Sequence, residues 1–500
     1  MPMSFTPEYK DFDAVQLAEL IKNKQVSPLE VLESCIELVE LYNPKINAVH
    51  HKLYDFAKDN LQKFSNGLFF GVPFLMKDLD SPIAGIPNSM GSKYLKDFKM
   101  PYDSNLADRF LKSGLKVVGK SATPELGLMF TTESKAFGPT RNPWDLDITV
   151  GGSSGGAASA VASRIVPIAH ASDGGGSIRV PAASCGLIGL KPSRGRISFS
   201  PSHGELWGGL ATPGVLSRSV RDTAYIYDNI FGSEIGDPYT LPYEKGSLIK
   251  ALKFKKTLKI GFLAKVFLPV ALSEEVKKAV LYNAKLCSEL GHKVEEIEIN
   301  YEAMDLAKAF LILIACHTSQ LLEELRVLKG KKYKNSELEN TTRMLDYVGK
   351  SFSGYDYALA RHTLQVISRR VVEQLESYDV VLLPVTSKPP PLIGSLRPKF
   401  TDELLNSIVM NLKLGWIFRV PIIRNAILQK LAPENLWYSP DTLLQNATGQ
   451  PAMNVPSYWT DKGIPLGTQF VSKIGDEATL ISLASQIEEI SSLKHRIPTL

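Results

Sequence analysis

The sequence predicts an α/β layered fold, and two observations carry this prediction. The chain has 500 residues, of which 44% are apolar and 22% charged, so it can bury a large core. Between residues 68 and 232, glycine-rich loops alternate with short apolar runs and helical stretches, which is typical of layered strands and helices. Size allows about two to four domains, but one large sheet is equally compatible with this length.

The N-terminal region predicts two helices that pack on something larger. Apolar residues recur at helical spacing between residues 13 and 41. Ser27 and Pro28, followed by Glu30, form a helix-opening signal, because a proline in the first turn loses no hydrogen bond there.

Strands and helices then alternate along the rest of the chain. Short apolar runs predict strands, and helical apolar spacing predicts helices. The elements in order are strands at 115–118 and 165–169, a polar connector at about 232–257, a strand at 259–263, a helix capped by Ser273 and ending near 290, a strand at 293–299, mostly helix over 300–380, a strand at 380–384, and strand and helix again over the last 55 residues.

Composition and charge narrow the functional classes. The formal charge of +5 is too small and too scattered for a nucleic-acid-binding surface. The four cysteines lie far apart with no C-x-x-C pair, which removes the zinc-ribbon and thioredoxin interpretations. We therefore expect a small, roughly neutral partner, no nucleic acid, and neither a metal nor an organic cofactor.

The sequence also predicts a soluble, cytoplasmic protein. The N-terminus has neither the basic start nor the apolar core of a signal peptide, and no run of about 18 apolar residues follows. Segment 408–430, IVMNLKLGWIFRVPIIRNAILQK, is apolar and basic without one acid. A cap or core helix pair broken at Pro421 is the first interpretation of this segment, and a membrane-surface patch is the second.

Two clusters of glycine and serine stand out, TVGGSSGGAASA at 149–160 and SDGGGSIRVPA at 172–182. Tight turns explain most such clusters in proteins. Phosphate binding is weakly indicated, because the first cluster lacks a P-loop lysine and the second has arginine where a dinucleotide fingerprint has glycine. An α/β-hydrolase elbow fits G-x-S-x-G around both Ser153 and Ser154, but the preceding NPWDLDITV is no apolar strand and only His495 lies late in the chain.

These clusters and their neighbours resemble the amidase signature family. The resemblance runs from about residue 10 to 490 and rests on GVPFLMKDL at 71–79, FGPTRNPWD at 137–145, GGSSGG at 151–156, DGGGSIRVPA at 173–182, CGLIGLKPSRGRIS at 185–198 and NATGQPAMNVP at 446–456. It implies one large α/β/α domain with a mixed central sheet covered by helices. Its parts are an N-terminal helical segment (1–66), a catalytic core (67–232) and a C-terminal part (233–500) with a helical cap at about 300–440.

The resemblance also implies the reacting groups, because Lys77, Ser153 and Ser177 match the family's lysine, cis-serine and nucleophilic serine. Ser177 would attack the amide carbonyl, while its proton passes to Ser153 and then to Lys77. Lys77 must then be neutral, and near pH 7 its pKa has to fall by about three, which burial behind the preceding apolar run can cause. Asp78 would oppose this fall unless strand alternation points it away.

Other residues are assigned to supporting roles. The N–H groups of four successive residues can turn toward one point, so we expect them to form the oxyanion hole: Gly174, Gly175, Gly176 and Ser177. Ser154 is expected to support the loop by hydrogen bonding, and Asp173 and Arg179 to fix it as structural partners. Gly127 and Phe130 lie in GLMFTTES at 127–134, which resembles the family segment lining the substrate channel.

Two positions depart from the family pattern. Val150 replaces the proline often found before the paired glycines, and Gly174 stands where the family usually has threonine or isoleucine. The first departure is expected to alter the local turn, and the second to loosen the anion pocket. Neither removes a reacting atom.

Several functional interpretations stay open at this point. Segment 198–224 resembles stand-alone bacterial amidases, including those that act on cyclic nylon-type dimers, more than the glutaminase subunit of a tRNA-dependent amidotransferase. A binding protein that has lost catalysis is a third interpretation, although all three relay residues are present. The expected partner is a small-molecule amide with a lipophilic acyl or an aryl group, and a homodimer is a further expectation.

Overall fold

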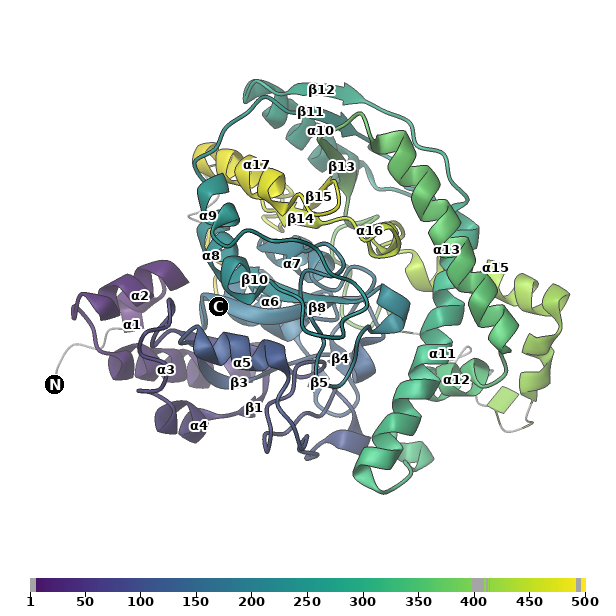
Figure 1. The fold of residues 1–500 in the computed structure, drawn as a ribbon, viewed down its shortest axis with the longest axis horizontal. Coiled ribbons are helices and arrows are strands. Elements are labelled where there is room, and N and C mark those ends of the chain that lie inside the picture. Colours follow the sequence, from purple (N-terminus) through teal and green to yellow (C-terminus); the bar gives the residue numbers. More distant parts are fainter. Residues whose placement is uncertain (1–5, 398–408, 411, 413, 492–495) are drawn as a thin grey trace.

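An 11-stranded mixed sheet forms the centre of the protein in this computed structural model, which describes residues 6–397, 409–410, 412, 414–491 and 496–500 (Figure 1). In sheet order its strands are β1 (Val49–Lys52), β3 (Lys116–Ser121), β2 (Pro73–Lys77), β8 (Ile168–Asp173), β10 (Thr212–Ser217), β9 (Ile188–Lys191), β14 (Ala452–Val455), β15 (Thr468–Ser472), β13 (Val380–Pro384), β11 (Lys259–Phe262) and β12 (Lys293–Glu296). Parallel pairs such as β2 with β8 and antiparallel pairs such as β8 with β10 share this sheet. The predicted α/β class with a mixed central sheet is confirmed.

Helices cover the sheet on both sides (Figure 1). In chain order they are α1 (Thr6–Tyr9), α2 (Ala14–Lys22), α3 (Pro28–Ile46), α4 (Tyr54–Asp59), α5 (Asn105–Lys112), α6 (Gly155–Ala162), α7 (Arg179–Cys185), α8 (Val220–Ile230), α9 (Ser247–Ala251), α10 (Glu274–Glu289), α11 (Ala303–Lys329), α12 (Asn340–Gly349), α13 (Gly354–Leu375), α15 (Pro421–Leu436), α16 (Leu443–Thr448) and α17 (Glu477–Ile490). Small ribbons pair β4 (Glu133–Ser134) with β5 (Gly138–Pro139), and β6 (Arg141–Asn142) with β7 (Asp145–Thr149).

Local capping explains where several helices begin. The Ser27 side chain accepts a hydrogen bond from the Glu30 N–H, and the Glu30 carboxylate accepts one from the Ser27 N–H, so α3 starts at Pro28 as predicted. Ser273 caps α10 by accepting from the Val276 N–H. Both predicted helix starts are confirmed.

Some strands differ from their predicted bounds. The strand predicted at 165–169 runs instead from Ile168 to Asp173, and the one predicted at 115–118 continues to Ser121. In both cases the backbone stays paired with neighbouring strands beyond the apolar run, because ladder hydrogen bonds do not require apolar side chains. Residues 145–149, which belong to the segment NPWDLDITV that lacks an apolar strand pattern, form β7 in a small ribbon outside the central sheet.

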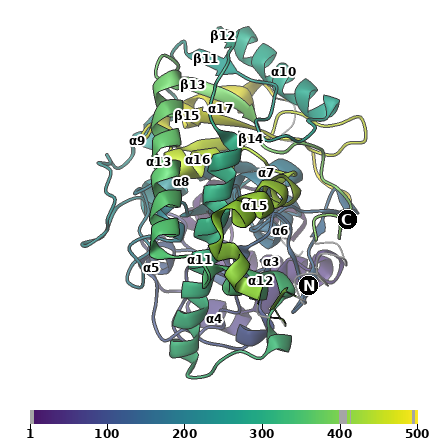
Figure 2. The same cartoon turned by 90° about the vertical axis from the view of Figure 1, so that its right-hand side faces the viewer.

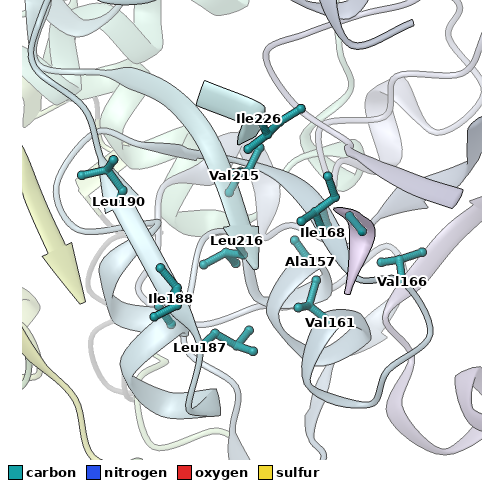
Figure 3. Packing of buried hydrophobic residues seen from close by; sticks show 14 of the residues in the cluster. Ala157, Val161, Val166, Ile168, Leu187, Ile188, Leu190, Val215, Leu216 and Ile226 are labelled. Atoms are coloured by element: carbon teal, nitrogen blue, oxygen red, sulfur yellow. The ribbon is translucent and has the colours of Figure 1, made fainter. Parts of the chain in front are cut away.

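Buried apolar side chains on one side of the sheet pack against strand β8 and hold it in place (Figure 3). Ala157 and Val161 of α6 lie in the same buried cluster as Ile168 of β8 and Val215 of β10. Each large apolar side chain buried in this way contributes on the order of 2 kcal/mol to the free energy of unfolding. The packing fixes the end of β8, from which the second glycine cluster continues.

Helices α11, α12, α13 and α15 lie together beside the sheet, within the predicted cap region of about 300–440 (Figure 2). By length and composition α11 could cross a membrane, but 61% of its most apolar 18-residue window is buried inside the protein. Its apolar side chains pack in a second core cluster with α13, α15 and α16. Helix α11 is therefore a core helix of the cap.

The segment 408–430 contains a short 3-10 helix, η5 (Leu414–Arg419), and the first part of α15, which begins at Pro421. Helix α15 buries a stripe of four side chains at helical spacing, Arg424, Leu428, Ala432 and Leu436, so the segment is helical on both sides of a break at Pro421, and its role as a cap stays a prediction. Trp416 and Ile422 remain exposed, and membrane contact stays a prediction. Residues 408, 411 and 413, like His495, lie outside the described residues.

Candidate active site

Lys77 is the last residue of β2 and lies at the centre of the site. The apolar run before it forms a fully buried strand, so the lysine side chain enters the interior with none of its surface exposed. Its Nζ atom donates hydrogen bonds to Ser153 Oγ at 2.8 Å and to Ser172 Oγ at 3.0 Å. The amine is therefore held by two hydroxyl groups.

Burial lowers the pKa of Lys77 to about 8, although the charges of Asp80 and Asp173 act in the opposite direction. The pKa of Lys77 is lowered, as predicted. It falls by less than the value of about three that a neutral lysine near pH 7 requires. Asp78 is engaged elsewhere, because its carboxylate accepts hydrogen bonds from the N–H of Ser89 at 2.8 Å and from the Ser89 hydroxyl.

Ser153 reaches the amine from the loop between β7 and α6. The peptide bond between Gly152 and Ser153 is cis, as the family resemblance implies. Gly152 presses against the backbone of Thr131, where an added Cβ would lie 2.5 Å from the carbonyl oxygen, so only glycine fits. Ser154 Oγ donates to the Ser172 carbonyl at 3.2 Å and accepts from the Ser172 N–H at 3.3 Å, which ties the loop to β8.

Asp173 and Arg179 form a fully buried ion pair beneath the second glycine cluster. Arg179 Nε and Nη2 donate to the two carboxylate oxygens at 3.0 and 2.9 Å. The other guanidinium contacts are the side-chain oxygens of Gln445, Gln469 and Asn446. Burial alone would raise the pKa of Asp173, but Arg179 and Asn446 outweigh it and lower that pKa. The aspartate stays ionised and acts as a structural anchor.

The glycine loop, residues 174–176, follows β8 directly, and the expectation that all its N–H groups serve the oxyanion hole is wrong for Gly176. The Gly176 N–H donates to Asp173 Oδ1 at 2.7 Å, because a buried carboxylate is a strong acceptor. The N–H of Ile178 donates to the other oxygen of the same carboxylate at 3.1 Å. Asp173 thus binds the N–H groups on either side of Ser177.

Aromatic rings surround the other two glycines. A Cβ added at Gly174 would lie 2.5 Å from the Trp207 ring, and one added at Gly175 would lie 3.0 Å from Phe310 and 3.8 Å from Phe130. The departure from the family pattern at Gly174 therefore makes room for an indole, rather than leaving the pocket loose as expected.

Ser177 follows the glycine loop and is only 7% exposed. Its Oγ atom makes no hydrogen bond to any residue in the described part of the chain. Lys77 and Ser153 are hydrogen-bonded to each other, and Ser177 is hydrogen-bonded to neither. Gly127 borders the same region, because a Cβ added there would lie 3.4 Å from Ser153 Oγ. Phe130, beside Gly175, completes the set of predicted contacts.

Sequence reasoning missed several residues at this site, and three of them show why. Ser172 stands directly before Asp173 in the quoted motif, and its position there was a usable signal. Trp207 lies in segment 198–224 and has a left-handed backbone with φ of 53°, which no sequence pattern indicates. Thr442 lies 267 residues beyond Gly175, whose carbonyl oxygen it binds, so no local pattern could reveal it.

Side chains with metal-binding potential are scattered in the described ranges. These ranges contain no group of three or more His, Cys, Asp or Glu side chains that could hold a metal ion. All four cysteines are free, and the three that are buried are Cys35, Cys185 and Cys287. Cys316 is half-buried on α11.

The chain is similar to known proteins over nearly its whole length. The profile of the Amidase family matches residues 30–481. The 6-aminohexanoate-cyclic-dimer hydrolases of Pseudomonas sp. (strain NK87) and Paenarthrobacter ureafaciens are each 32% identical over 491 residues, covering 95% of this chain and 94% of each relative. The solved structure of a 6-aminohexanoate cyclic dimer hydrolase has a TM-score of 0.88 at 31% identity and covers 98% of this chain and 99% of that one.

The similarity in sequence and the similarity in fold therefore point to the same group of proteins. Both include the strands, loops and helices that carry the site described above. The chain belongs to the amidase family and is an amide-hydrolysing enzyme.

Proposed function

We propose that the enzyme cleaves a C–N amide bond through Ser177, Ser153 and Lys77, with an acyl-enzyme intermediate on Ser177. The observation that carries the proposal is the 2.8 Å hydrogen bond from Lys77 Nζ to Ser153 Oγ at a buried amine whose pKa is lowered. Ser177 Oγ attacks the carbonyl carbon and passes its proton to Ser153 Oγ. Ser153 passes its own proton to Lys77, which acts as the general base in its neutral form.

The negative oxygen of the tetrahedral intermediate needs N–H donors that are not already engaged. The N–H groups of Gly174, Gly175 and Ser177 remain candidates, since that of Gly176 binds Asp173. One such donor lowers the barrier by about 3 kcal/mol. Lys77 then returns a proton through Ser153 to the leaving amine, and water hydrolyses the acyl group on Ser177.

The substrate that fits best is a small neutral amide, cyclic or linear. Rings of Trp207, Phe310 and Phe130 lie against the glycine loop, so the groups next to the scissile carbonyl meet apolar surface. The names of the two relatives make the cyclic dimer of 6-aminohexanoate the first compound to test. A glutaminase subunit of a tRNA-dependent amidotransferase is not favoured, because these relatives are named as hydrolases.

The proposal is tested by labelling with a fluorophosphonate probe and by measuring intact mass. Wild-type protein should gain the mass of one probe, and Ser177→Ala should gain none. Turnover of an amide panel that contains anilides, the cyclic dimer and glutamine should fall at least about a thousandfold in Ser177→Ala, Ser153→Ala and Lys77→Ala.

Labelling that survives Ser177→Ala would remove Ser177 as the nucleophile. Full activity in Lys77→Ala would remove the proposed base. Ammonia release from glutamine that appears only when other subunits are added would favour the amidotransferase alternative.

A further inference from the structure

The peptide group that joins Gly175 to Gly176 is held at both ends. Its carbonyl oxygen, on Gly175, accepts a hydrogen bond from Thr442 Oγ1 at 2.6 Å. Its N–H, on Gly176, donates to Asp173 Oδ1 at 2.7 Å. Because a peptide group is planar, two bonds in opposite directions fix its orientation.

This orientation also determines where the neighbouring N–H groups point. Gly176 has φ of 137°, a backbone region that glycine alone enters easily, so the chain turns sharply between Gly175 and Ser177. Asp173 binds the N–H groups of Gly176 and Ile178. The N–H of Ser177 lies between these two anchored groups in sequence, and φ and ψ of Gly176 set its direction relative to the held Gly175–Gly176 peptide plane.

Thr442 is itself held rigidly from the side of the C-terminal segment. Because the Thr442 hydroxyl donates its hydrogen to Gly175, it accepts one from Ser439 Oγ at 2.7 Å, and Ser439 Oγ lies 2.8 Å from the Val385 carbonyl oxygen. Thr442 and Ser439 are both fully buried. Thr442 also packs tightly on the loop, because a Cβ added at Gly176 would lie 2.5 Å from Thr442 Oγ1.

We propose that Thr442 is a positioning residue for the oxyanion hole, because its hydroxyl fixes the Gly175–Gly176 peptide and thereby the direction of the adjacent N–H donors. The inference rests on the proposed function. It adds that a residue outside the relay controls stabilisation of the transition state. A merely structural role would instead affect the stability of the fold and leave turnover by folded protein unchanged.

The test compares three substitutions at this position. Thr442→Val keeps the shape and removes the hydroxyl, Thr442→Ala removes the hydroxyl without adding bulk, and Thr442→Ser keeps the hydroxyl. We expect kcat to fall about ten- to a hundredfold in the valine and alanine variants, with KM changed less than about threefold, because the donors act mainly in the transition state. Thr442→Ser should keep kcat within about threefold of wild type.

Thr223→Val is a matched control. Thr223 is also fully buried, its Oγ1 atom lies 2.6 Å from Ser217 Oγ, and it donates to the Ser219 carbonyl at 3.2 Å. Thr223 lies on α8, beside Ser217 at one end of β10. Thr212, which pairs with Asp173, lies at the other end of that strand. Loss of the same kind of hydroxyl should lower Tm in both valine variants but leave kcat of Thr223→Val near wild type.

Several outcomes would overturn the inference. Wild-type kcat in folded Thr442→Val would do so, as would a fall in Thr442→Ser equal to that in Thr442→Val. An equal fall in Thr223→Val would also do so. If Thr442→Val does not fold, wild-type kcat in Thr442→Ala decides against it in the same way. Failure of the proposed function is a separate result, because it appears as turnover that survives Ser177→Ala.

Discussion

At the scale of single residues, the protonation of Lys77 is a balance between burial and two nearby carboxylates. Burial is the larger influence and lowers the lysine pKa to about 8, whereas Asp80 and Asp173 raise it. Asp173 is fixed in its ion pair with Arg179, so its charge is constant. Asp80 is the carboxylate to substitute, since its Oδ1 atom makes no hydrogen bond in the described part of the chain and lies 3.8 Å from His170 Nε2.

This balance predicts the pH dependence of turnover. A general base works when deprotonated, so kcat/KM for an amide that does not itself titrate should rise with pH through about 8 and then level off. Asp80→Asn removes a charge that raises the lysine pKa, so the rising limb should move to lower pH. The measurement is a pH profile of wild type and variant, with the surface variant Asp108→Asn as control. A limb that moves to higher pH in Asp80→Asn would contradict the assignment of the base.

The close approach of Trp207 to Gly174 gives a second prediction at this scale. Gly174→Thr restores the residue type that the family usually has, but its Cβ would lie 2.5 Å from the indole ring, so kcat/KM should fall. Adding Trp207→Ala should recover part of the loss, because the ring is then absent. A double-mutant cycle should give a coupling of about 0.5 to 3 kcal/mol, and additive effects would show that the two residues do not interact.

Single residues also show which features of the site can be predicted from the sequence. The apolar run before Lys77 was sufficient to predict its burial, because five buried positions in a row form an interior strand. The charges that oppose the fall in pKa were not predictable, since they depend on which loops meet around the amine. The bond between Gly176 and Asp173 was missed for a related reason, because the motif gives composition and not the direction of each N–H.

At the scale of elements, the carboxylate of Glu125 joins the core to the cap helix α12. Glu125 accepts hydrogen bonds from Ser92 Oγ at 2.6 Å, from the N–H of Glu339 at 2.7 Å and from the Thr342 hydroxyl at 2.5 Å. Glu339 and Thr342 lie at the start of α12. Two residues after Glu125 comes Gly127, which borders Ser153, so this contact connects the cap to the site.

Burial raises the pKa of Glu125 to about 7, which makes the stability of this contact depend on pH. A carboxyl whose folded pKa is raised contributes its full stability below its unfolded pKa of about 4.3 and loses that contribution as pH rises through about 7. Glu125→Gln keeps a neutral side chain at every pH. The difference in Tm between the variant and wild type should therefore shift in favour of the variant between about pH 5 and pH 8.

The control for this experiment is Glu244→Gln, since Glu244 is exposed and paired with Lys250 on the surface. A Tm difference for Glu125→Gln that stays constant with pH would show that Glu125 is ionised throughout. Thermal unfolding followed by circular dichroism at four pH values is sufficient.

Element bounds were predictable where the pattern is local. Strand β13 has the predicted limits of Val380 and Pro384, and Ser27 and Ser273 begin their helices as expected. Strand β8 was misplaced, because its polar end is held by pairing with β10 rather than by its own side chains. Helix η5 and the break at Pro421 agree with the cap interpretation of this segment.

At the scale of the whole molecule, strands from the end of the chain lie inside the sheet. Strands β14 and β15 stand between β9 and β13 and connect the early strands to β11 and β12. Sequence could predict a mixed sheet from the family resemblance, but not this order, because neighbours such as β9 and β14 are separated by more than half of the chain.

This topology predicts that the segment carrying β14 and β15 is essential for folding. A protein that stops after Gly449 lacks β14 and β15, so β9 and β13 become exposed edges and should promote aggregation. Removal of residues 492–500 keeps all the strands and should leave a folded enzyme. Solubility, circular dichroism and size-exclusion chromatography compare the two, and a soluble, active protein ending at Gly449 would contradict this account of the sheet.

The network around Arg179 has a consequence for the timing of biosynthesis. The partners that hold its guanidinium, Gln445, Asn446 and Gln469, are translated more than 260 residues after the arginine itself. A nascent chain that already contains Lys77, Ser153 and Ser177 still has an arginine without its amide partners. We expect the glycine loop to reach its final arrangement only after this C-terminal segment has been translated, because Asp173 alone has to hold the arginine until that point.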